Sequence, residues 1–320
     1  MSRISRYQES ISKFIKTKSS YSDIIKSNSV YENIINLNDH EASIILLTVL
    51  NGQYKKKNLK AHHGYYMSSG IDLMMTYVMI NDNLNYYETK FGKNFIKNIT
   101  NRMVIHVHKC LKQNIETLEN MIDKDKVLKI YKNISNYVNK KMEELTECVD
   151  FKTNEKAHRT DIIKYKFSEK NIIENKYRKL NVIDKDLLVN YVDRTYGSVC
   201  QCAFVVGWLL GLGEDKMINN LEKLGSHLGL IIKLAKDFKN LERDINSAVN
   251  GLSNNLIVNH GIHQCFELFN ESKTSLLEGC LTLDIYNITV KEVIDYIENT
   301  FDDHLKNTDL ELNSRYSSFS

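Results

Sequence analysis

The chain has 320 residues, of which 42% are hydrophobic, so it is long enough to bury a large core. Its net charge of +3 is spread along the sequence without a basic arm, which removes any compositional case for nucleic-acid binding. No segment approaches the roughly 20 apolar residues that cross a bilayer, the N-terminus has no apolar signal region, and the cysteines lack the spacing of a disulfide framework. We therefore expect a cytoplasmic protein with reduced thiols and no membrane span.

Apolar residues recur with a helical period along almost the whole chain. The clearest expected helices lie, in chain order, at 31–35, 44–50, 104–118 and 293–297. Sustained alternation of period two is missing, and the chain contains no proline, which leaves long helices unbroken. A bias toward Asn, Lys, Ile and Tyr explains the lack of proline equally well. The sequence predicts an all-α fold, a large single-domain helical bundle around a central cavity, with no sheet.

Two segments differ from this pattern. Residues 1–30 are expected to form a peripheral N-terminal segment, whereas 31–320 form the helical domain. The stretch Phe151–Lys179 is the most polar and most charged internal segment. A connection of that length usually belongs to a flap or lid unless part of it is helical.

One expected helix, Gly225–Asp244, carries polar side chains in apolar surroundings. The polar residues that recur every three or four positions, and therefore share one stripe, are Lys233, Lys236, Asp237, Asn240 and Asp244. Charged side chains surrounded by apolar residues such as Ile231, Leu234 and Phe238 need ionic or hydrogen-bonding partners. The stripe therefore predicts either a ligand site inside the bundle or internal ion pairs within the stripe and with Glu242.

The spacing of this helix resembles the second aspartate-rich motif of the polyprenyl diphosphate synthases. In that family a Gln precedes an Asp-Asp-x-x-Asp cluster that holds magnesium against the substrate diphosphate. Here Lys233 stands where the family has Gln, and Lys236-Asp237-x-x-Asn240 stands in place of the Asp cluster, so two of three carboxylates are missing. The resemblance implies an isoprenoid-synthase fold.

Further landmarks of the family are matched in the same order, from about Leu59 to Leu305. The segment Lys60–Tyr66 resembles the start of the third family helix, Tyr191–Ser198 resembles the Lys-Thr-Gly segment, and Ser253–Gly261 resembles the segment that closes the pocket. His106 matches a histidine that binds the donor substrate. The diphosphate-binding residues that the resemblance implies are Lys60, His63, His106, Arg194, Thr195, Lys233 and Lys236.

The first aspartate-rich motif of the family should follow seven residues after His106. Gln113, Asn114 and Thr117 occupy the places of its three carboxylates. A shifted register offers Glu116, Glu119 and Asn120 instead, although a solvated acidic face explains these residues too. If Gln113 is correctly placed, we expect it to face Lys236 across the cavity. Likewise, Lys60, His63, His106 and Arg194 should converge on one mouth of the cavity.

These substitutions imply a polyprenyl-diphosphate-synthase-like protein that has lost most metal-binding aspartates. It would be a non-catalytic or regulatory homologue that binds either a prenyl diphosphate, or its product, or a catalytic partner. In the second case we expect a homo- or heterodimer with a related synthase subunit. One alternative is a divergent active prenyltransferase or class I terpene synthase that uses Lys233, Lys236 and a single, weakly held magnesium at Asp237, Asn240 and Asp244. The other is a helical scaffold without a ligand.

Overall fold

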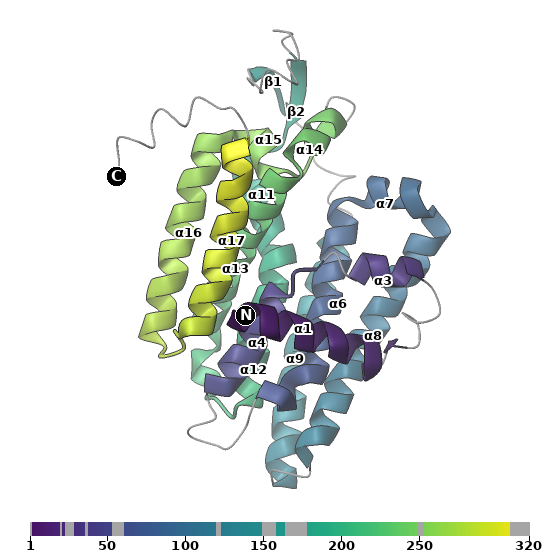
Figure 1. Cartoon of the computed structure of the whole chain (residues 1–320), viewed down its shortest axis with the longest axis vertical. Coiled ribbons are helices and arrows are strands. Elements are labelled where there is room, and N and C mark those ends of the chain that lie inside the picture. The colour runs from purple at the N-terminus through teal and green to yellow at the C-terminus, as the bar shows by residue number, and fades with distance from the viewer. Residues whose placement is uncertain are drawn as a thin grey trace.

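The computed structural model describes residues 2–19, 21–22, 29–35, 38–52, 61–119, 123–148, 158–163, 178–248 and 253–307. Long helices run side by side along the long axis of the molecule, with the hairpin β1–β2 at one end (Figure 1). The elements of the first half are α1 (Arg3–Thr17), α3 (Ser29–Ile35), α4 (Glu41–Gly52), η1 (Ala61–Gly64), α6 (Tyr65–Asp82), α7 (Leu84–Phe91), α8 (Lys93–Glu119) and α9 (Lys124–Glu147). Those of the second half are β1 (His158–Ile163), β2 (Arg178–Val182), α11 (Lys185–Val192), η4 (Asp193–Gly197), α12 (Ser198–Leu210), η5 (Asp215–Met217), α13 (Ile218–Lys239), α14 (Leu241–Ala248), α15 (Leu256–His260), α16 (Ile262–Thr282) and α17 (Ile288–Asn307).

The centre of the bundle is α12, which is apolar on all sides and buried except at Trp208. A helix with this composition has to be surrounded, and α4, α9 and α13 pack against it. Two glycines let α13 approach closely. A Cβ atom at Gly225 would lie 2.3 Å from the backbone nitrogen of Gln201, and one at Gly229 would lie 2.5 Å from that of Gly197. Helix α13 is therefore held directly on the backbone of η4 and α12.

The chain enters α12 through an unusual turn. Helix α11 begins at Asp184, whose carboxylate accepts hydrogen bonds from the backbone N–H groups of Asp186 and Leu187. It then continues into η4, a π-helical turn, before α12 begins at Ser198. Such wide turns are rare in proteins as a whole, and those that occur are often found at functional sites.

Helix α1 crosses the bundle and packs on α4, α6 and α17. Its apolar face buries Ile4, Ile11 and Ile15, and the ring of Phe14 stacks on Tyr65 with the centroids 5.3 Å apart. Beyond these ring and core contacts, the side chain of Gln8 donates to the backbone carbonyl of Asp39 at 2.9 Å. The first helix is thus joined to the segment that leads into α4.

The predicted all-α class is confirmed, whereas the expectation of no sheet is wrong for part of 151–179. There β1 pairs with β2 in antiparallel register, with His158 opposite Val182. The β-branched residues Thr160, Ile162 and Ile163 favour a strand, but they are too few to give sustained alternation. None of the helices in the described ranges is long and apolar enough to cross a bilayer.

Candidate functional site

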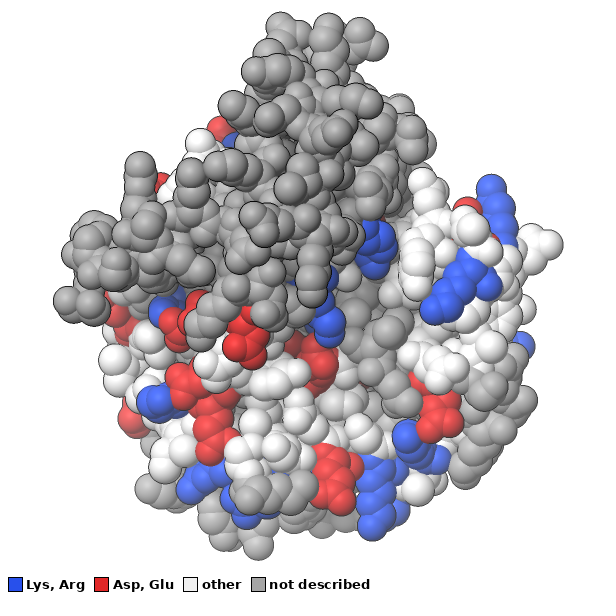
Figure 2. All heavy atoms as spheres, turned by 45° about the horizontal axis from the view of Figure 1, so that its top comes forward, with Lys and Arg blue, Asp and Glu red and all other residues white. Residues whose placement is uncertain are grey.

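A polar cleft lies where the end of α6 and the start of α7 face the end of α13 and the following α14. It contains two neighbouring hollows of about 410 Å³ and 230 Å³. The residues that line both hollows are Asp82, Asn83, Tyr86, Lys90, Arg243 and Asp244. Among the described residues visible in Figure 2, basic and acidic side chains lie next to one another on the face that includes this end of the molecule.

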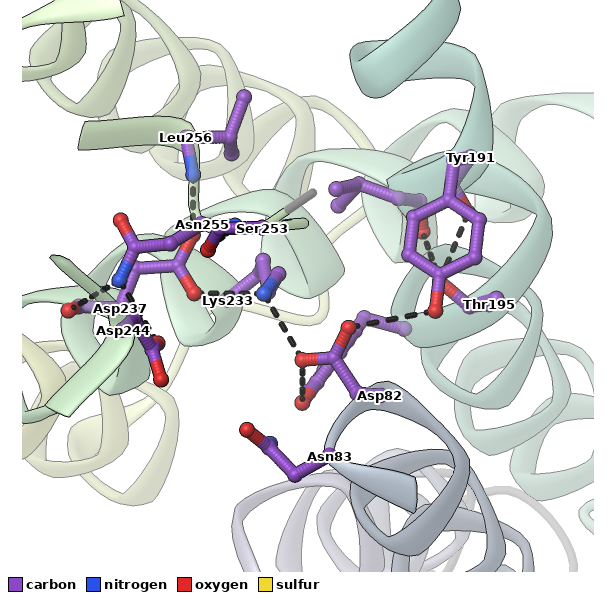
Figure 3. A network of polar contacts seen from close by, with 12 residues as sticks. Asp82, Asn83, Tyr191, Thr195, Lys233, Asp237, Asp244, Ser253, Asn255 and Leu256 are labelled. Carbon is purple, nitrogen blue, oxygen red and sulfur yellow. Dashed lines mark hydrogen bonds and ion pairs between the residues drawn. The ribbon is translucent and has the colours of Figure 1, made fainter. Parts of the chain in front are cut away.

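The floor of the cleft is an ion bridge between its two walls. The Lys233 Nζ atom, from α13, lies 2.8 Å from Asp82 Oδ2 at the end of α6 and 2.5 Å from Asp237 Oδ1 one turn along its own helix (Figure 3). The three side chains are only 2%, 5% and 3% exposed. The ammonium also lies 5.6 Å from the ring centroid of Tyr196. The buried cation of Lys233 therefore contacts a carboxylate that lies 151 positions earlier in the chain.

Two tyrosines hold the Asp82 carboxylate in place. The hydroxyl of Tyr191 donates to Oδ1 at 3.2 Å, and that of Tyr196 donates to Oδ2 at 3.3 Å. Burial, followed by the charge of Asp82, raises the pKa of both hydroxyls well above the ordinary value. They therefore remain protonated donors at any physiological pH.

The segment that precedes α15 fixes the other carboxylates. Asp237 Oδ2 accepts the backbone N–H of Leu256 at 2.8 Å. The amide of Asn255 donates to the backbone carbonyl of Asp237 and to Asp244 Oδ2, at 2.8 and 3.0 Å. Asp244 Oδ1 in turn pairs with Arg243 at 2.9 Å. The segment expected from the sequence to close the pocket thus lies against the end of α13.

The charges of the bridge influence one another strongly. Burial alone would lower the pKa of Lys233, but Asp237 and Asp82 outweigh this effect, so the pKa is raised and the ammonium stays charged. Burial raises the pKa of Asp237 to about 7 despite the lowering effect of Lys233, and Asp82 adds to the rise. One cation facing two buried carboxylates leaves an excess negative charge, which explains why protonation of Asp237 is favoured.

Lys236 lies outside this bridge. Its ammonium is 3.4 Å from Asp39 Oδ2 and 4.0 Å from Glu41 Oε1, so it faces the start of α4. Among the predicted internal pairs, Lys233 with Asp237 is present, whereas the side chain of Glu242 is outside the described residues. Asn240 lines the smaller hollow at the end of α13.

The residues assigned to the first aspartate-rich motif do not line the cleft in which Lys236 is found. Gln113, Asn114 and Thr117 lie on α8, and the described residues that line the two hollows include none of them. Asn114 is buried and accepts the backbone N–H of Met67, while Thr117 donates to the carbonyl of Asn114. The wall of the cleft opposite α13 is supplied by α6, two helices before α8, so the placement of the first motif on α8 stays a prediction.

The expected diphosphate-binding residues are dispersed. Lys60 is outside the described residues, and His63 lies on η1. His106 is buried on α8, edge-on to Tyr21 at 6.0 Å, where burial lowers its pKa. Arg194 pairs with Glu147 on α9 at 3.1 Å, and the buried Thr195 donates to the carbonyl of Tyr191. His106 and Arg194 thus contact different residues, and their convergence at one mouth stays a prediction.

Asp82 is a site residue that the motifs in the sequence do not identify. It is the last residue of an 18-residue helix whose interior is almost wholly buried, and it lies in the acidic and amide run Asn81-Asp82-Asn83. By composition alone, this position indicates only a break between helices. The signal that could have found it is a carboxylate at the end of a buried helix, where the chain emerges into the cleft.

These residues do not fit a magnesium ion. Both oxygens of Asp82, Asp237 and Asp244 already accept from Lys233, Arg243, the two tyrosines, Asn255 and the Leu256 backbone. Within the described ranges, no three His, Cys, Asp or Glu side chains are grouped so as to hold a metal. Magnesium requires unoccupied oxygens in near-octahedral geometry, and an ammonium at this position would repel it.

Comparison with known proteins identifies the fold. No protein-family model matches the chain. No characterised protein matches it in sequence. Among solved structures, it is similar to a geranylgeranyl pyrophosphate synthetase from the archaeon Geoglobus acetivorans, with 7% identity, a TM-score of 0.60, and 93% of this chain and 97% of the other covered.

Two further structures are similar at 13% identity. The first is a Helicobacter pylori geranyltransferase complexed with magnesium and isoprenyl diphosphate, with a TM-score of 0.57 and 95% and 99% of the chains covered. The second is a deletion mutant of the heterotetrameric geranyl pyrophosphate synthase of mint, with a TM-score of 0.52 and 92% and 95% covered. The chain therefore has the isoprenoid-synthase fold, as the resemblance in its sequence predicted.

Proposed function

We propose that this chain is a non-catalytic relative of the prenyl diphosphate synthases that binds an isoprenyl diphosphate, or its product, in the cleft without ionising it. The observation that carries the proposal is the occupation of the cleft carboxylates. Asp82 is the carboxylate of the α6 wall in this cleft, and Lys233 already pairs with it. Departure of a diphosphate needs cations that face the leaving group, and a charge already paired with two carboxylates is poorly placed to help.

Binding of the diphosphate requires only basic side chains in the cleft, whereas its departure also requires cations that face the leaving group. Lys90 and Arg243 line both hollows, and Lys236 and Lys239 line the smaller one, so fixed cations surround the entrance. Arg243 donates to the amide oxygen of Asn83 at 2.6 Å, which orients the guanidinium toward the α6 wall. Charge-assisted hydrogen bonds from such groups suit a phosphate ester. The isoprenyl diphosphate in the complex of the Helicobacter pylori geranyltransferase supports this choice of ligand.

The proposal is tested with the purified wild type, isoprenyl diphosphates of several chain lengths and magnesium. We expect no magnesium-dependent release of diphosphate and no condensation product. Lys236→Asp alone should not restore activity, because the α6 wall would still offer only Asp82, paired with Lys233. Turnover that stops when EDTA removes magnesium would establish the divergent-enzyme alternative.

Binding is measured separately by calorimetry in EDTA. We expect Lys90→Ala to weaken binding of the isoprenyl diphosphate by about tenfold or more, since a hydrogen bond to a charged group contributes about 1.5–3 kcal/mol. Lys291→Ala is the matched control, because Lys291 pairs with Asp295 on α17 and lines neither hollow. Equal affinity of both variants, or no binding by the wild type, would contradict the proposal.

A second candidate role is that of a subunit in a heteromeric synthase. The observation that favours it is a set of exposed apolar side chains on the hairpin formed by α8 and α9, where Ile105, Leu128 and Tyr131 are 54%, 54% and 37% exposed. The mint structure, named as a heterotetrameric synthase, supports the same role. Light scattering tests the homodimeric form of this proposal, and Ile105→Glu should then shift the mass toward the monomer.

A further inference from the structure

The Lys233 ammonium contacts two carboxylates in the way that a bridging metal ion does. Its ammonium contacts one oxygen from each wall of the cleft, at 2.8 and 2.5 Å, and thereby joins the end of α6 to α13. The remaining oxygen of Asp82 accepts from the hydroxyl of Tyr191, and that of Asp237 accepts from the backbone N–H of Leu256. The two walls are therefore joined by a cation that belongs to the chain itself.

The surroundings keep this cation in place. Lys233 is 2% exposed, its stem is enclosed by the apolar residues of α13, and the ring of Tyr196 lies 5.6 Å from the ammonium. A buried lysine with two carboxylate partners has no comparable site to move to. A divalent ion entering from solvent would meet a like charge and oxygens that are already hydrogen-bonded.

We infer that the Lys233 ammonium takes the place of a divalent cation in this cleft, and that its removal uncovers a cation site between Asp82 and Asp237. Without the lysine, the two buried carboxylates lose the ammonium that lies between them. Such a pair attracts a small divalent ion, which commonly uses one or two carboxylates and completes its shell with water. The proposed loss of catalysis follows from this exchange, but the inference concerns the cation alone.

The experiment compares Mn²⁺ binding by the wild type, Lys233→Ala, and Lys233→Ala combined with Asp82→Asn. Electron paramagnetic resonance measures bound Mn²⁺, and thermal unfolding is followed in EDTA and in increasing Mn²⁺. We expect no site in the wild type and one in Lys233→Ala, with an affinity at least about tenfold tighter than any residual binding by the wild type. The melting temperature of Lys233→Ala should rise with Mn²⁺ as for any ligand of the folded state. The double variant should lose both responses.

Lys236→Ala is the matched control, because Lys236 is the neighbouring cation on the same helix but lies outside the bridge. It should gain no Mn²⁺ site. Lys233→Met keeps the volume of the aliphatic stem and replaces Lys233→Ala if the cavity prevents folding. A variant that folds only in the presence of Mn²⁺ supports the inference. A variant that remains unfolded with and without Mn²⁺ counts against it.

Two outcomes overturn the inference directly. One is stoichiometric Mn²⁺ binding by the wild type that Asp82→Asn abolishes, since the bridge would then coexist with a metal. The other is a folded Lys233→Ala and a folded Lys233→Met that both ignore Mn²⁺. Failure of the proposed function is a separate result. A wild type that binds no isoprenyl diphosphate in EDTA would remove that function and leave the cation exchange standing.

Discussion

The molecule contains two buried ionic networks that differ in their relation to solvent. The first is the bridge of Lys233 with Asp82 and Asp237, which forms the floor of the cleft. The second lies beneath α1, where His40 Nδ1 is 2.9 Å from Asp72 Oδ2 and His40 Nε2 is 2.9 Å from the hydroxyl of Ser12. Both are almost fully enclosed, yet only the first lines a hollow among those described.

The second network has the connectivity of a hydrolytic Ser-His-Asp triad without its chemistry. Burial would lower the pKa of His40, but Asp72, followed by Glu41 and Asp39, reverses this effect and raises the pKa. A histidine whose charged form is favoured is a poor base for Ser12. Asp72 also accepts from Ser43 at 2.6 Å and Asn38 at 3.0 Å, so one acid and one base are matched and fully hydrogen-bonded.

The difference shows which kind of buried charge points to function. The network under α1 is balanced, with neutral donors satisfying what remains, and it joins the first helix to α4 and α6. The bridge in the cleft is unbalanced, since one cation serves two carboxylates and Asp237 has a raised pKa. Balance indicates a structural role, whereas imbalance beside an open hollow indicates a place for a ligand or for the cation that has replaced one.

The largest effect is expected from Lys233→Ala. Removal of one partner leaves the remaining charges buried and uncompensated, so the free energy of unfolding should fall by about 3–5 kcal/mol in EDTA. Urea denaturation measures this loss of unfolding free energy. Lys291→Ala breaks an exposed pair four residues apart on α17 and should lower the free energy of unfolding far less, because solvent screens the two charges. Equal losses for the two variants would show that the bridge contributes no more than a surface pair.

A smaller effect is expected from Asp72→Ala. This change leaves the side chains of His40, Ser43 and Asn38 without their shared acceptor, and His40 can lose its proton, so the loss should be about 1–3 kcal/mol. Asp72→Asn, which keeps one acceptor oxygen, should lose less. Binding of an isoprenyl diphosphate in the cleft should not change. If it does change, the two networks are coupled and the contrast between them fails.

The smallest effect concerns pH. Because the pKa of His40 is raised on folding, its stabilisation is fully present below the unfolded value of about 6.5 and is lost as pH rises through the folded value. His40→Gln should therefore lose less unfolding free energy than the wild type as the pH rises above about 6.5. Asp237, with its raised pKa, contributes to the pH dependence of both proteins and cancels in the difference. Parallel curves for the two proteins would remove the assigned role of His40.

The helical fold could be predicted from the sequence because it depends on local periodicity. The same holds for the pairing of Lys233 with Asp237, which lie four residues apart on one helix. Asp82 could not be predicted, since its contact with Lys233 joins residues 151 positions apart and exists only after packing. Counting from His106 places the first motif on α8, although α6, with 18 residues, spans about 27 Å and reaches the cleft by itself.

Because of the π-helical turn at η4, the two hydrogen bonds to Asp82 depend on the spacing of the tyrosines along the chain as well as on their chemistry. Tyr191 and Tyr196 are five positions apart, and in a regular α-helix they would point in directions about 140° apart. The wider turn brings both hydroxyls to the two oxygens of one carboxylate. A spacing of four would bring two tyrosines to one face of a regular α-helix, whereas the spacing of five found here requires the wider turn. The spacing of the two tyrosines and the width of the turn therefore have to match for both hydroxyls to reach Asp82.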